Sequence, residues 1–214
     1  MKKLISAAAV LTGSLSPLAP MAGLVALALS APAHAQPAAA AADVFVRQIS
    51  MEVIDSVKAD TAIQAGDVSK ILGLVDTKVM PNVNFEVVTR SAVGPKWREA
   101  SPEQRTKLQS EFKTLLVRVY SGALTQIRDQ TVEITRSQPV QNSTQVIVQS
   151  EVRGKGEPIK LDYRLDKFND AWKIIDVNVG GIWLVQSYRS QFAQVLGGTG
   201  GIDALITRLV EQNK

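Results

Sequence analysis

WKIIDVNVGGIWLVQSYRSQF, residues Trp172–Phe192, is the stretch around which this chain is organised. Its first part, Trp172–Val179, is rich in β-branched residues and partly alternates, which is typical of a half-buried strand. Gly180-Gly181 then allows a sharp turn. From there large side chains recur at helical spacing, on a stripe made of Trp183 (or Leu184), Tyr188, Phe192 and Val195 or Leu196. A strand that passes directly into such a helix can form the wall of an apolar cavity or a closed core, and the spacing is the same for both.

Three segments upstream of this stretch also read as strands. Residues 132–134, 145–152 and 159–165 alternate between apolar and polar side chains. The connections between them are short and rich in turn residues, so neighbouring strands pair antiparallel. Together with 172–179 they predict a twisted meander of four strands.

The strongest helix start in the chain is Ser101-Pro102-Glu103-Gln104. It combines a serine N-cap, a proline at the first helical position and a glutamine that completes a capping box. The helix that follows is predicted to run for roughly five turns. Its apolar stripe consists of Leu108, Phe112, Leu115, Leu116, Val119, Tyr120, Ala123, Leu124 and Ile127.

Shorter helices are predicted on both sides of the sheet segments. Asp43 is expected to cap a helix that ends near Ala59, and further helices are expected over 68–79, from Asn82 or Asn84, and over 202–211. Helices first, a sheet later and helices last is the order of an α+β fold, with the N-terminal helices and the long helix packed on the sheet.

The N-terminus resembles a secretory signal peptide. Met1-Lys2-Lys3 is basic, an apolar run follows, and Ala33-His34-Ala35 fits the cleavage rule. Cleavage is therefore expected after Ala35, with export to a periplasmic space; a retained N-terminal anchor is the alternative. Residues 36–42 are expected to be a disordered tail, and 43–214 a single domain.

Composition excludes several classes of site. The chain has no cysteine, and its one histidine, His34, lies in the predicted signal peptide. A mature chain without either residue has no Ser-His or Cys-His nucleophile, no disulfide, no ordinary zinc site and no haem ligand, so no cofactor or metal is expected. Removal of the signal peptide takes away Lys2 and Lys3 and leaves 22 basic and 20 acidic residues. The mature chain has no basic run that would indicate nucleic-acid binding.

The central stretch resembles the signature of the MlaC family, also called the toluene-tolerance family. The matching residues are Trp172, Lys173, Asp176, Val177, Gly181, Ile182, Leu184, Tyr188, Arg189, Ser190, Gln191 and Phe192. Trp183 stands where the family commonly has serine, and Ser187 where it commonly has asparagine. The order Gly94-x-x-Trp97 followed by Ser101-x-Glu103-Gln104 is also similar to the family pattern.

The resemblance implies a soluble, monomeric periplasmic carrier of phospholipid. Such a carrier moves lipid between an outer-membrane lipoprotein complex and an inner-membrane ABC transporter complex of the Mla system, and so maintains outer-membrane lipid asymmetry. It implies an apolar cavity between helices and sheet that holds the acyl chains. The expected lipid-binding residues are Phe112, Leu116, Tyr120, Val146, Val148, Leu161, Tyr163, Val177, Val179, Trp183, Leu184, Tyr188 and Phe192.

Four further residues are candidates for contact with a headgroup or a partner: Lys96, Trp97, Arg98 and Arg189. For each there is a structural alternative. Lys96, Trp97 and Arg98 can form a helix-turn plug with a solvated rim, and Arg189 can pair with a carboxylate such as that of Asp176.

Two other functional classes remain open at this point. Asp162, Tyr163, Asp176 and Tyr188 could support carboxylate and tyrosine chemistry in a small enzyme on a cone-shaped α+β fold. The chain could also be an adaptor that docks envelope complexes without carrying a ligand.

Overall fold

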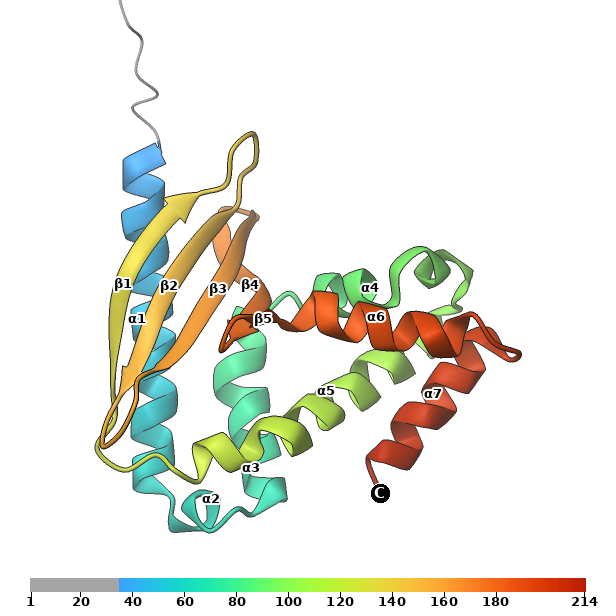
Figure 1. Cartoon of the computed structure of the whole chain (residues 1–214), viewed down its shortest axis with the longest axis horizontal. Coiled ribbons are helices and arrows are strands. Elements are labelled where there is room, and N and C mark those ends of the chain that lie inside the picture. Colours follow the sequence, from blue (N-terminus) through green and yellow to red (C-terminus); the bar gives the residue numbers. More distant parts are fainter. Residues whose placement is uncertain (1–34) are drawn as a thin grey trace, which may run out of the picture. The chain divides into compact units, whose positions relative to one another are not determined.

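An antiparallel sheet with strand order β1-β2-β3-β4-β5 forms one side of the structure, a computed structural model that describes residues 35–214 (Figure 1). The strands are β1 Thr131–Pro139, β2 Val146–Arg153, β3 Ile159–Phe168, β4 Ala171–Val179 and β5 Ile182–Trp183. The predicted four-strand meander is confirmed. The short fifth strand was not predicted; it forms because Gly180 and Gly181, with φ of 58° and 94°, turn the chain back onto β4.

Helices precede and follow the sheet, so the predicted α+β class is confirmed. Before the sheet come α1 Ala35–Ala59, α2 Thr61–Gln64, α3 Val68–Leu74, the π-helix η1 Val75–Val79, the 3₁₀ helix η2 Met80–Asn82, α4 Phe85–Val93, the 3₁₀ helix η3 Gly94–Glu99 and α5 Pro102–Leu124. After it come α6 Leu184–Leu196 and α7 Gly201–Gln212. Asn84 caps α4, because its side chain accepts a hydrogen bond from the Val87 backbone N–H at 3.2 Å.

Helix α1 corrects the prediction for residues 36–42. It begins at Ala35, so this segment is helical instead of a disordered tail, and Asp43 lies inside the helix and does not cap it. Alanine has the highest helix propensity, and Ala42 is completely buried against the sheet, with Ala38 packed beside it. Apart from Ala35, the predicted signal peptide lies outside the described residues.

Three apolar clusters hold these elements together. One lies between α1 and the sheet and includes Val46, Val146, Val148 and Leu165. A second joins α4, α5, α6 and α7, which gather beyond the end of the sheet (Figure 1). The third joins the C-terminal half of α1 to α3 and α5 through Val57, Ile71 and Val117. The sheet and the long helix α5 therefore pack on different partners, and a space remains between them.

The capping box at the start of α5 is present as predicted. The Ser101 side chain accepts a hydrogen bond from the Gln104 N–H at 3.2 Å, and the Gln104 side chain accepts one from the Ser101 N–H at 2.9 Å. We expect Ser101→Ala to lower the free energy of unfolding by about 1 kcal/mol, because the Gln104 backbone N–H loses its side-chain acceptor. Chemical denaturation measures the change. The control is Ser110→Ala in the exposed interior of the same helix, where alanine is the better helix former; equal midpoints for Ser101→Ala and wild type would contradict the prediction.

Candidate functional site

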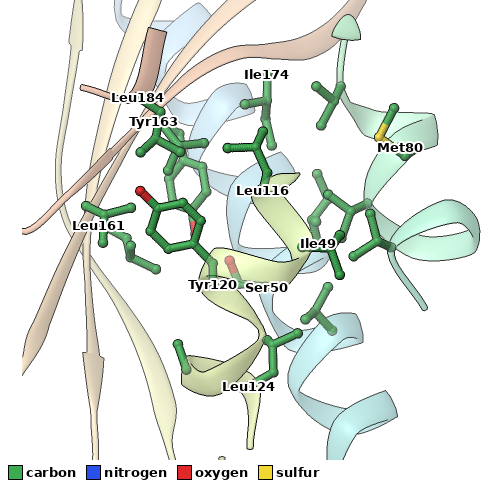
Figure 2. A pocket seen from close by; sticks show the side chains of 18 of the residues that line it. Ile49, Ser50, Met80, Leu116, Tyr120, Leu124, Leu161, Tyr163, Ile174 and Leu184 are labelled. Atoms are coloured by element: carbon green, nitrogen blue, oxygen red, sulfur yellow. The ribbon is translucent and has the colours of Figure 1, made fainter. Parts of the chain in front are cut away.

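An apolar cavity of about 430 Å³ lies between the sheet and the helices (Figure 2). Strands β3 and β4 form one wall with Leu161 and Ile174. Helix α1 contributes Ile49 and Val53, α5 contributes Leu116, and the irregular segment from α3 to η2 contributes side chains that include Met80. The cavity exists because α5 packs on α3, α4 and α7 and not closely on the sheet, so the apolar faces of these elements enclose space.

The structure brings eight of the predicted lipid-binding residues together around this cavity. They come from the long helix, from two central strands and from the first turn of α6: Phe112, Leu116, Tyr120, Leu161, Tyr163, Val177, Val179 and Leu184. Their position around one apolar cavity is consistent with lipid binding. Lipid binding by these residues is still a prediction.

Val146 and Val148 were expected on the cavity wall, but the structure places them elsewhere. They are 2% and 0% exposed and lie under α1, against Ala42 and Val46. Both project from the same face of the sheet as the cavity-lining strand residues, because side chains on a strand alternate and the register pairs Val148 with Tyr163. The first half of α1 covers this part of the face.

Trp183, Tyr188 and Phe192 also lie outside the cavity lining. The Trp183 ring lies under the guanidinium of Arg164, with the central carbon of the group 4.9 Å from the ring centroid. Tyr188 and Phe192 pack edge-to-face on Phe112, at centroid distances of 4.9 and 5.1 Å. The helical stripe of α6 does face inward, but most of it faces the other helices, and Leu184 alone of these stripe residues reaches the cavity.

Sequence reasoning missed the contribution of α1 and of the segment from α3 to η2. Ile49, Val53, Ile71 and Leu74 all line the cavity. Ile49 and Val53 lie four residues apart within the helix predicted to end near Ala59, which is the spacing of one helical face, so the signal was present. It did not distinguish a stripe that faces a cavity from one that packs on a core.

Burial changes the chemistry of two tyrosines near the cavity. It raises the pKa of Tyr163, whose hydroxyl interacts with Ser50 on α1 and with Ser150 on β2. It also raises the pKa of Tyr188 to about 12, and the neighbouring hydroxyl of Tyr120 adds to that shift. Both phenols are therefore neutral at physiological pH and act as hydrogen-bonding groups.

Asp176 has a structural role at the junction of β4 and α6. It accepts hydrogen bonds from the backbone N–H groups of Val177 at 2.9 Å and Val185 at 3.0 Å, which supports the N-terminus of α6. Burial raises the pKa of the Asp176 carboxyl, and the nearby Arg164 opposes that shift. The predicted alternative of an Arg189–Asp176 pair is not formed, because the Arg189 guanidinium instead lies over Gly94.

The predicted cluster of Lys96, Trp97 and Arg98 is divided between core and surface. Trp97 is only 5% exposed and belongs to the helical core, with the Arg105 guanidinium 5.4 Å from its ring centroid. Lys96 forms a surface ion pair with Glu99 at 2.8 Å, and Arg98 is exposed. Trp97 therefore fills the core behind this turn. Contact of Lys96, Arg98 and the exposed Arg189 with a headgroup or a partner is still a hypothesis.

The four residues considered for catalysis do not all share one site. Asp162 projects from the opposite face of the sheet to Tyr163, since the two are adjacent on β3. Within residues 35–214 no group of three or more acidic, histidine or cysteine side chains is placed to hold a metal ion. In the same range, no helix combines the length and the apolar character needed to cross a membrane.

One end of the cavity lies at the protein surface. Ala123 on α5 and Ile159 at the start of β3 line the cavity and are also exposed, Ile159 to 50%. A more polar surface hollow adjoins this end and shares Val152 and Ile159 with the cavity. An elongated apolar molecule can therefore lie in the cavity while a polar group attached to it stays in contact with water.

This chain is similar to several known proteins, and the matches agree with one another. The family model described as "MlaC protein" matches residues 47–211. The "Toluene tolerance protein ttg2D" of Pseudomonas putida is 24% identical over 156 residues, which cover 72% of this chain and 73% of the relative. The "Intermembrane phospholipid transport system binding protein MlaC" of Haemophilus influenzae is 24% identical over 170 residues, or 78% of this chain and 79% of the relative.

A solved structure extends the comparison to three dimensions. It is the phospholipid-binding protein from Ralstonia solanacearum, determined in complex with a phospholipid. It is 38% identical to this chain, and the superposition has a TM-score of 0.77 and covers 80% of this chain and 96% of the other.

Proposed function

This chain belongs to the MlaC family, and from that premise we propose that it carries phospholipid, with acyl chains held in the cavity between α1, α5 and the sheet. The observation that carries the proposal is the apolar cavity itself, in a fold shared with a phospholipid-bound protein at 38% identity. The lining is almost entirely aliphatic and aromatic, which suits a hydrocarbon chain and offers little to a polar substrate.

The energetics of such a cavity suit a carrier. Transfer of acyl chain from water into an apolar site contributes about 0.8 kcal/mol per methylene. A chain of about 15 methylenes would thus gain on the order of 10 kcal/mol, which is enough to hold a lipid away from water. A bilayer offers the same chain a similar environment, so uptake and release are close to balanced, as a protein that passes its cargo on requires.

The finer parts of the proposal follow from family membership. The chain acts in the periplasm after removal of its signal peptide, and it receives and delivers lipid at an outer-membrane lipoprotein complex and an inner-membrane ABC transporter complex. The sequence match to an intermembrane phospholipid transport binding protein supports this assignment. The exposed basic residues Lys96, Arg98 and Arg189 are candidates for the docking contacts.

Native mass spectrometry of the freshly purified mature chain tests the proposed function. We expect adducts with phospholipid masses that disappear after extraction with organic solvent and return after incubation with phospholipid vesicles. The matched control is the same measurement on an exported protein of similar size without an apolar cavity. A chain that never acquires lipid under these conditions would leave the adaptor reading as the better one.

A further inference from the structure

Polar side chains are rare on the cavity wall, and most of them are already engaged. Lys113 pairs with Asp76 at 2.6 Å, and the Ser121 hydroxyl donates to the Arg118 carbonyl at 3.2 Å. Asp176 is engaged by the backbone at the start of α6. The hydroxyls of Ser50 on α1 and Tyr163 on β3 interact with each other, and both residues line the cavity.

Tyr120 is the remaining polar residue on the lining, and its one neighbour of the same kind is Tyr188. Two adjacent hydroxyls supply two O–H donors, and a hydrogen bond between them uses only one. Tyr188 is buried among aromatic rings and lies outside the cavity lining, whereas Tyr120 lines the cavity, so a bound molecule can reach only the Tyr120 hydroxyl of this pair. The Tyr120 hydroxyl is therefore a hydrogen-bond donor that a ligand in the cavity can meet.

The position of Tyr120 matches a particular part of a lipid. It lies on α5 one turn before Ala123 and Leu124, close to the end of the cavity that reaches the surface, and its ring projects toward Leu161 (Figure 2). In a phospholipid that enters tail-first, the groups at this depth lie between the hydrocarbon and the headgroup. These groups are the ester carbonyls, which accept hydrogen bonds, whereas methylenes do not.

We propose that the Tyr120 hydroxyl donates a hydrogen bond to an ester carbonyl of the bound lipid, and that this makes the carrier select ester-linked over ether-linked phospholipids. The inference rests on the proposed function and adds a specificity-determining residue to it. When the cavity holds no lipid, water can accept the hydrogen bond. An ether-linked lipid displaces that water but offers no carbonyl, so the donor loses its partner.

The test is a competition between two lipids that differ only in this linkage. Delipidated protein is mixed with vesicles containing equal amounts of diacyl and dialkyl phosphatidylethanolamine of the same chain length, and native mass spectrometry gives the ratio of the two adducts. We expect wild type to prefer the diester lipid by about 2- to 10-fold, the range of one net hydrogen bond. Tyr120→Phe should bring the ratio close to one while total lipid binding persists.

Thr89→Val is the control, since it removes a buried hydroxyl that lies outside the cavity lining and donates to the Phe85 carbonyl at 2.8 Å. It should keep the wild-type preference. Equal loading of the two lipids by wild type would overturn the inference and leave the carrier function standing, and this measurement does not depend on any variant folding. A preference that survives Tyr120→Phe, or that is lost equally in both variants, would also overturn the role of Tyr120. Absence of both lipids from wild type would instead refute the proposed function.

Discussion

Val148→Trp should strongly destabilise the protein. Val148 is completely buried between β2 and α1, where Ala42 and Val46 approach the sheet closely. An indole cannot fit there unless α1 moves away from the strands, and overpacking of this kind costs about 1–3 kcal/mol or more. Thermal or chemical unfolding of delipidated protein measures the loss, and its lipid binding should fall only as the folded fraction falls.

Val148→Ile provides the comparison, because it adds a single methylene at the same position. We expect a much smaller loss of stability than for tryptophan. A tryptophan variant that unfolds at the wild-type midpoint and has lost its lipid would show that the cavity, and not α1, lies over this part of β2.

The location of Val148 depends on contacts within the sheet and on contacts with a distant helix, and only the first can be predicted from the sequence. Alternation on the strands correctly predicted which side chains share a face, and the register places Val148, Tyr163 and Val177 in one row across three strands. What covers each part of that row depends on α1. The sequence predicts a helix that ends near Ala59, but its periodicity does not say that this helix lies over β2, and Ala42, which also packs there, falls in the segment predicted to be disordered.

Features specified by neighbouring residues could be predicted well. The Ser101 capping box, the long apolar stripe of α5 and the turn at Gly180-Gly181 each depend on a few adjacent side chains. The cavity depends instead on how far α5 stands from the sheet, which is fixed by contacts between segments distant in the sequence. Leu116 and Leu115 are adjacent on α5, yet Leu116 lines the cavity while Leu115 lies in the helical core. Periodicity cannot make that distinction, because a cavity wall and a packed core require the same residue types.

The row across the sheet also provides the sharpest test of the cavity. Val177 on β4 faces the same side as Val148, two strands away, but it is only partly buried at the margin of the α1 cluster and lines the cavity. We expect Val177→Trp to abolish most lipid binding while the empty protein stays folded, because the indole occupies space that an acyl chain would fill. Bound phosphorus per protein and the unfolding midpoint after delipidation are the two measurements.

The size of the effect follows from the volume that the indole takes. Displacement of only two methylenes from the cavity would cost about 1.6 kcal/mol at ~0.8 kcal/mol each, which is more than a tenfold loss of affinity. The free energy of unfolding of Val177→Trp should exceed that of Val148→Trp by about 1 kcal/mol or more. The added volume is the same, but the indole meets empty space at position 177 and packed atoms at position 148. Equal destabilisation by the two substitutions would mean that the sheet and α5 close on each other in solution, and a folded Val177→Trp with full lipid content would place the acyl chains away from β4.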